Sequence, residues 1–162
     1  VSTEAAALII EQASSQGVTV PLMAGDTWDS NVITEAATGK DIDIYVTTFY
    51  QEGGNKEFDE GLKAYIDGDA TALQNNGGND MIAAVSAMGY DAYYVALEAL
   101  KNAGSTDPKA VNDALWKTTY DGVSGHIEFD QTNGDAVRDT AYVKKANTET
   151  GTWELGAEQK AT

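Results

Sequence analysis

The sequence has 162 residues, with 26 Asp or Glu against 10 Lys or Arg, so its net charge at neutral pH is -16. This length allows one ordinary domain with a hydrophobic core. The acidic excess argues against binding to nucleic acid or to an anionic lipid surface, because both require clusters of Lys or Arg. The absence of cysteine excludes disulfides, thiolate metal ligands and cysteine nucleophiles.

The N-terminal part of the chain predicts alternating helices and strands. In chain order these are a helix at residues 2–17, a strand at 18–25, a helix at 31–39 and a strand at 41–50. Ser2 or Thr3 can cap the first helix, and Ser30 can cap the second. Pro21 argues against a central position for the first strand. This alternation indicates an α/β fold.

The middle of the chain predicts mostly helix. The expected elements are a turn at 51–55, a helix at 56–68, a polar loop at 69–79, a long helix at 80–103 and a helix at 108–120. Asn55, Asp80 and Asp107 are the expected caps of the three helices. Apolar residues lie on nearly all sides of the long helix, so we expect it to be largely buried.

The C-terminal part changes to a period of two, which is typical of strands. Strands are expected at 126–130, 140–147 and 152–155, with turns at 131–135 and 148–151. The last residues are expected to fray. The predicted architecture is therefore an α/β fold that ends in a β-meander.

The loop after the first strand combines acids with an indole. It reads GDTWDS and contains Asp26, Thr27, Trp28 and Asp29. Open α/β sheets bind ligands at the carboxyl ends of their strands, and a ligand with a cationic group and an apolar body would use both residue types. Three alternatives remain open. Asp26 can be a solvated loop acid, Trp28 can pack beneath the loop, and Asp29 with Ser30 can cap the next helix.

Patterns for catalysis and for metal binding are missing from the sequence. The EF-hand spacing is absent, and neither GxGxxG nor GxxxxGK[ST] occurs. His126 is the single histidine, no serine lies in a nucleophile-elbow pattern, and we expect His126 to be structural or exposed. These absences favour a binding module without cofactor or metal over an enzyme.

Four stretches of the sequence together resemble a known family. They read AAALIIEQASSQGVTVPLMAGDTWDS, YVTTFY, MGYDAYYVALEALKNAGSTDPKAVNDAL and YDGVSGHIEFDQTNGDAVRDTAYVKK. The combination is similar to the C-terminal half of type I periplasmic binding proteins of the branched-chain amino-acid class, which serve ABC importers. The similarity runs from about residue 3 to about residue 154.

The resemblance implies portions of two Rossmann-like lobes with a ligand cleft between them. On that pattern residues 1–48 belong to lobe II, residues 49–126 to lobe I, and residues 127–162 to the return segment and tail of lobe II. Family members are about twice as long as this chain. We therefore expect a fragment, or a product that pairs with a missing N-terminal half on a second chain or swaps elements in a dimer.

The resemblance also implies a site. Asp26 takes the position of the acid that pairs with the α-ammonium of a bound amino acid, with Thr27 and Trp28 beside it. Val85 and Met88, in the start of the long helix, take positions that face the ligand side chain. The implied partners are a small amino acid and the membrane permease of an ABC transporter.

The implied location is periplasmic or extracellular, with lipid anchoring through an absent N-terminus. A sensory or regulatory ligand-binding domain of the same fold is the first alternative. A hydrolase that uses Asp26 and Asp29 is the second, more remote one.

Overall fold

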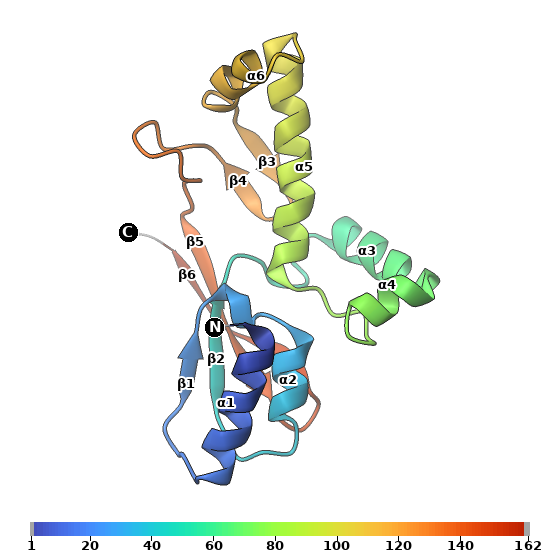
Figure 1. The fold of residues 1–162 in the computed structure, drawn as a ribbon, viewed down its shortest axis with the longest axis vertical. Coiled ribbons are helices and arrows are strands. Elements are labelled where there is room, and N and C mark those ends of the chain that lie inside the picture. Colours follow the sequence, from blue (N-terminus) through green and yellow to red (C-terminus); the bar gives the residue numbers. More distant parts are fainter. Residues whose placement is uncertain (1, 161–162) are drawn as a thin grey trace. The chain divides into compact units, whose positions relative to one another are not determined.

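The computed structural model describes residues 2–160, which form two compact units (Figure 1). Unit 1 contains residues 2–84 and 140–160, and unit 2 contains residues 85–139. The expected lobes of a longer protein, residues 1–48, 49–126 and 127–162, stay a prediction.

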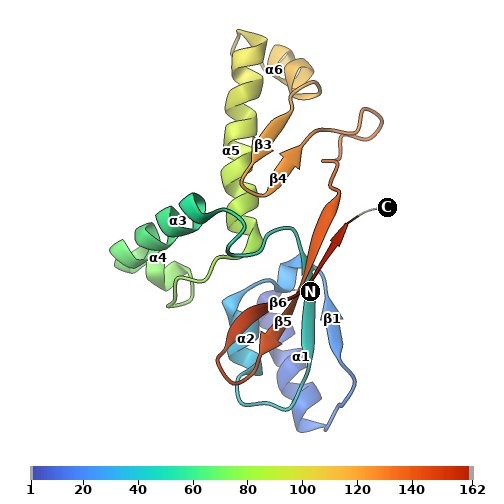
Figure 2. The same cartoon turned by 180° about the vertical axis from the view of Figure 1, so that it is seen from behind.

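Unit 1 is built on a four-stranded mixed sheet. Its strands are β1 (Leu22–Ala24), β2 (Ile44–Thr48), β5 (Thr140–Asn147) and β6 (Thr152–Lys160), in the spatial order β1-β2-β5-β6. β1 and β2 are parallel, and the other two pairs are antiparallel. Helices α1 (Thr3–Ser15) and α2 (Asn31–Ala37) lie on one face of this sheet, as the two opposite views show (Figures 1 and 2).

The core of unit 1 lies between this sheet and the two helices. Strand β2 alternates, so that Ile44, Val46 and Thr48 point inward and are buried. Helix α1 contributes residues four apart on one face. The rest come from α2, from the loop after β1, from the segment before β2 and from β5. The buried hydrophobic residues of this cluster are Ala6, Ile10, Trp28, Ile33, Ala37, Ile42, Ile44, Val46 and Ala146. Each large aliphatic side chain buried here contributes about 1.5–3 kcal/mol relative to exposure.

Unit 1 also contains α3 (Lys56–Gly68) and α4 (Ala70–Asn75). Asn55 caps α3 by accepting a hydrogen bond from the Phe58 amide at 3.0 Å. The expected loop at 69–79 is wrong in its first half, where α4 forms. Asp69 caps that helix by accepting from the Ala72 amide at 2.7 Å, and the Asn- and Gly-rich sequence follows only after the helix has ended.

Unit 2 consists of most of α5 (Ala84–Ala103), α6 (Pro108–Leu115) and a hairpin of β3 (Tyr120–Gly122) and β4 (Gly125–Ile127). Asp91 of α5 is buried and holds the hairpin turn, because its carboxylate accepts from the amides of Val123 and Ser124 at 2.8 Å each. A Cβ atom on Gly122 would lie 2.4 Å from the carboxylate carbon of Asp91. This close approach requires glycine at position 122.

The expected caps of α1, α2, α3 and α6 are confirmed, and β5 has the expected bounds. Helix α5 begins four residues later than expected, because Asp80 does not cap it but pairs with Lys63 at 3.1 Å. Its expected burial is also wrong, since Val85 is 72% exposed and Tyr93 is 62% exposed.

Three strands also differ from the expectation. The predicted strand at 18–25 is confined to β1, after Pro21. The helix expected at 108–120 ends at Leu115, and its last expected residue, Tyr120, begins β3 instead. β4 covers only the start of the expected strand at 126–130. The predicted fraying is wrong for residues 156–160, which continue β6 alongside β5.

Candidate ligand-binding site

The GDTWDS loop lies at the carboxyl end of β1, where the sequence predicts a site. Its residues Asp26–Trp28 form a single 3-10 turn, closed by hydrogen bonds from the Trp28 amide to the Gly25 carbonyl and from the Asp29 amide to the Asp26 carbonyl, at 3.1 and 2.9 Å. Because β1 and β2 are parallel, the end of β2 at Thr48 lies on the same edge of the sheet. The loop therefore has the position that open α/β sheets use for ligands.

Asp26 and Thr27 are exposed at the tip of this turn. Within residues 2–160, the Asp26 side chain makes no hydrogen bond and no ion pair, whereas Asp29, three residues on, makes several. An exposed, unpaired carboxylate at the end of a strand can bind a cationic group without first breaking an internal bond.

Trp28 points the other way. It is 8% exposed and belongs to the hydrophobic core of unit 1. This placement agrees with the alternative in which Trp28 packs beneath the loop and fixes its conformation. Contact between Trp28 and a ligand stays a prediction.

Asp29 makes a buried ion pair with Lys144 that the sequence analysis did not anticipate. The Nζ atom of Lys144 lies 3.0 Å from each carboxylate oxygen, and the two side chains are only 2% (Lys144) and 1% (Asp29) exposed. Thr48 Oγ1 donates to the same carboxylate at 2.8 Å, and the Ala84 amide donates to it at 2.9 Å. Asp29 thus has a complete set of buried partners.

These contacts argue against two roles considered for Asp29, as a helix cap and as a catalytic acid. The cap of α2 is Ser30, whose hydroxyl accepts from the Val32 amide at 3.3 Å, so the interpretation of Asp29 as a helix cap is wrong. Asp29 is also buried and neutralised by Lys144, which removes it as a second acid for a hydrolase that would use Asp26 and Asp29.

Val85 and Met88 belong to the first turns of α5 in unit 2. Val85 is 72% exposed. Met88 is half-buried and lines an apolar cavity of about 380 Å³ within unit 2, together with side chains of α5, α6 and the hairpin. Their contact with a ligand stays a prediction.

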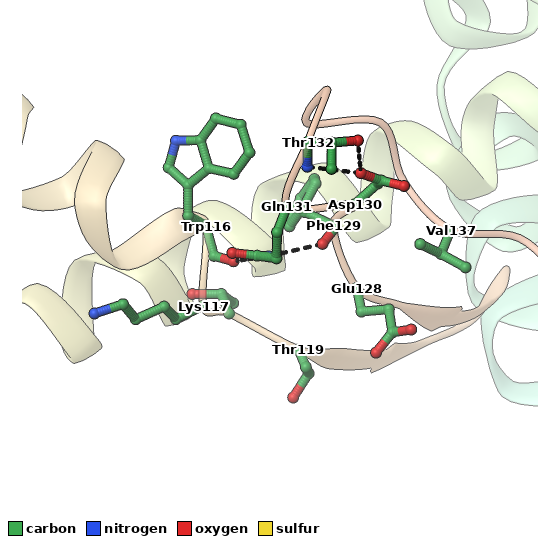
Figure 3. Close-up of a pocket in the computed structure, with 10 residues that line it drawn as sticks. Trp116, Lys117, Thr119, Glu128, Phe129, Asp130, Gln131, Thr132 and Val137 are labelled. Atoms are coloured by element: carbon green, nitrogen blue, oxygen red, sulfur yellow. Dashed lines mark hydrogen bonds between the residues drawn. The ribbon is translucent and has the colours of Figure 1, made fainter.

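Unit 2 also contains a larger, more polar cavity of about 490 Å³ beside Trp116 (Figure 3). Several of its polar groups bond one another. The Gln131 amide donates to the carbonyls of Trp116 and Phe129 at 2.7 and 2.8 Å, and Asp130 accepts from the Thr132 amide at 2.7 Å. None of the residues predicted to bind a ligand lines this cavity.

His126 is exposed on β4, as expected. Its Nδ1 lies 2.5 Å from a carboxylate oxygen of Asp121, and this hydrogen bond raises the pKa of the imidazole above 6.5. In residues 2–160 no three His, Cys, Asp or Glu side chains lie close enough together to hold a metal ion. In the same part of the chain, no helix is both long and apolar enough to span a bilayer.

A family model described as "Periplasmic binding protein" matches residues 1–151. The chain therefore belongs to the periplasmic binding protein family. Membership of this family implies an extracellular or periplasmic location. No curated protein matches the chain.

Solved structures share the fold. The leucine-binding protein LivK of Thermotoga maritima superposes with a TM-score of 0.72 at 30% identity, over 98% of this chain and 43% of that protein. LivJ of Streptococcus pneumoniae, a branched-chain amino-acid transporter substrate-binding protein solved with isoleucine, gives 0.71 at 21% identity, over 99% of this chain and 42% of that one.

A solute-binding protein of an ABC transporter from R. palustris, solved with benzoate, gives a TM-score of 0.70 at 16% identity, over 97% of this chain and 41% of that one. The chain spans about two fifths of the length of each of these proteins. The family resemblance and the α/β fold class predicted from the sequence are confirmed.

Proposed function

We propose that this chain is part of an extracytoplasmic solute-binding receptor of an ABC importer and that its ligand is a small amino acid, branched-chain or related. The observation that carries this proposal is the exposed, unpartnered carboxylate of Asp26 at the carboxyl end of β1. The similarity to a leucine-binding protein and to a receptor solved with isoleucine supports the ligand class.

The proposed mechanism starts with Asp26. Its carboxylate pairs with the α-ammonium of the ligand, and Thr27 adds a hydroxyl beside it. An ion pair between unit charges strengthens as water leaves, because the effective dielectric constant around it falls. Val85 and Met88 supply apolar contact to the side chain. In the whole protein, closure of the lobes by a hinge motion excludes water, and a membrane permease receives the ligand.

The location and the anchor belong to the same proposal. The receptor acts in the periplasm or at the cell surface, with lipid anchoring through a segment outside this sequence. Membrane vesicles that contain the permease test this partner, since they should take up the ligand only when the receptor is added.

Calorimetric titration tests the ligand. Leucine, isoleucine and valine are titrated into this chain and into any longer protein that contains it, with benzoate and a fatty acid as competing classes. We expect the aliphatic amino acids to bind. Binding of benzoate or the fatty acid alone would overturn the amino-acid proposal, and absence of heat with every compound in the longer protein would overturn the receptor proposal.

Substitution of Asp26 tests the role of its carboxylate. Asp26→Asn removes one charge and keeps the shape, and we expect amino-acid affinity to fall by about 2–4 kcal/mol. Asp41→Asn is the matched control, since Asp41 is an exposed acid of unit 1 that precedes β2 at the other end of the strand. Unchanged affinity in Asp26→Asn would show that Asp26 is only a loop acid.

A further inference from the structure

One carboxylate joins distant parts of the sequence in unit 1. Asp29 accepts hydrogen bonds from Thr48 at the end of β2, from the amide of Ala84 at the start of α5, and from Lys144 in β5. The Asp29 amide in turn donates to the carbonyl of Asp26 at 2.9 Å. A single residue therefore connects the exposed loop acid to the first residue of the long helix.

Both oxygens of the carboxylate are engaged. An ionised carboxyl group offers about four acceptor positions. In Asp29, Oδ2 accepts from the Thr48 hydroxyl, the Ala84 amide and the Lys144 ammonium, and Oδ1 accepts from the same ammonium. Each contact is directional and charge-assisted, so together they leave the loop and the helix start one relative position.

Stability alone explains this arrangement poorly. Moving two charges out of water costs free energy that their attraction only partly returns, and apolar residues of similar volume often replace a buried ion pair without loss. Both side chains are almost completely buried, so this cost applies in full. Apolar residues cannot accept the hydrogen bond from the Ala84 amide, so they cannot hold that amide in a fixed position.

We infer that Asp29, held by Lys144, is a positioning residue that fixes the loop carrying Asp26 to the first residue of α5. Ala84 is a residue of unit 1 and directly precedes Val85, for which a ligand contact is predicted. The link to ligand affinity rests on the proposed function, whereas the fixed geometry is a property of unit 1 without ligand.

The first test uses the double variant Asp29→Leu/Lys144→Met, which removes both charges and keeps apolar side chains of similar size. Amide hydrogen exchange is followed by NMR at Ala84 and at Val46, a buried residue of β2. We expect the Ala84 amide to exchange at least about tenfold faster, because it loses its acceptor, while the Val46 amide keeps its protection. The matched control is Asp43→Asn/Lys145→Met, which removes a half-exposed ion pair between the residue before β2 and the neighbouring position of β5 and should leave both amides unchanged.

Two exchange results would overturn the inference. The first is unchanged protection at Ala84. The second is an equal loss of protection at Ala84 and at Val46, which would mean that the pair only contributes to global stability.

The second test measures affinity for leucine at a temperature where Val46 protection shows every variant to be folded. We expect the Asp29→Leu/Lys144→Met variant to bind at least about tenfold more weakly than the wild type, and the control to bind equally well. Equal affinity in both variants would overturn the role in ligand binding. If the wild type binds none of the panel, the proposed function fails, and the exchange result still decides whether Asp29 fixes the loop to α5.

Discussion

The Nζ atom of Lys144 lies 3.0 Å from both carboxylate oxygens of Asp29, across 115 residues of sequence. Each of these side chains is almost fully buried, so each charge is stabilised by the other and not by water. Removal of one partner therefore has a different consequence from removal of both.

Substitution of Lys144 by Met leaves the Asp29 carboxylate buried without its cation. We expect the free energy of unfolding to fall by about 3–5 kcal/mol, as measured by urea denaturation followed by circular dichroism. Lys145→Met is the matched control, because Lys145 is the adjacent residue and its partner Asp43 is half-exposed. Its loss should stay below about 1 kcal/mol, and losses of equal size in the two variants would contradict the prediction.

Substitution of Asp91 by Asn replaces one acceptor oxygen with a donor that faces the amides of Val123 and Ser124. We expect a loss of about 2–3 kcal/mol in the free energy of unfolding, because buried donors of the turn lose a charged acceptor. Asp121→Asn in the same hairpin is the control, since Asp121 is exposed. If urea denaturation gave the two variants the same stability, the proposed role of Asp91 in holding the hairpin would be wrong.

Substitution of Gly122 by Ala places a methyl group 2.4 Å from the Asp91 carboxylate carbon unless the backbone shifts. We expect Gly122→Ala to lower the melting temperature, because steric overlap with Asp91 pushes the hairpin away from α5. Gly61→Ala is the opposite control. Gly61 lies inside α3 with open space around it, so alanine there should stabilise the helix by about 0.5–1 kcal/mol. A rise in melting temperature in both variants would refute the steric argument.

The pH titration of His126 follows from its hydrogen bond to Asp121, which raises the pKa of the imidazole above 6.5. Because the pKa is higher in the folded state, the stabilisation is complete below pH 6.5 and is lost as the pH rises through the folded-state pKa. The single histidine gives one imidazole signal in proton NMR. Its midpoint should lie above 6.5 in the wild type and move down in Asp121→Asn. A midpoint that does not respond to Asp121→Asn would exclude this hydrogen bond as the cause.

Local signals in the sequence predicted most of the elements of the fold. Ser2, Ser30, Asn55 and Asp107 each cap the helix that they were expected to cap, because capping depends on residues only two or three positions away. Asp80 shows where this reasoning fails. It has the chemistry of a cap, but a lysine 17 residues earlier in the sequence engages it instead.

In the candidate site, too, local patterns predicted one feature and missed another. The position of Asp26 after β1 followed from a local pattern of strand and loop, and the structure exposes that carboxylate. The partner of Asp29 could not be found by such a pattern. A signal for Lys144 did exist, since alternation along β5 puts it on the same side as Ala146, which lies in the core. A lysine at an inward position requires a counter-charge, but alternation does not say which of the 26 acids supplies it.

Strand β6 has a consequence for the behaviour of this protein in solution. It ends the described sheet, so the nine residues Thr152–Lys160 present a free backbone edge that can pair with another copy. A net charge of -16 keeps copies apart in dilute buffer, and this repulsion acts over a Debye length of about 10 Å at 0.1 M salt and about 3 Å at 1 M. We therefore expect ionic strength to control the colloidal state of the protein, with concentrated samples dispersed at low salt and associated through this edge at high salt.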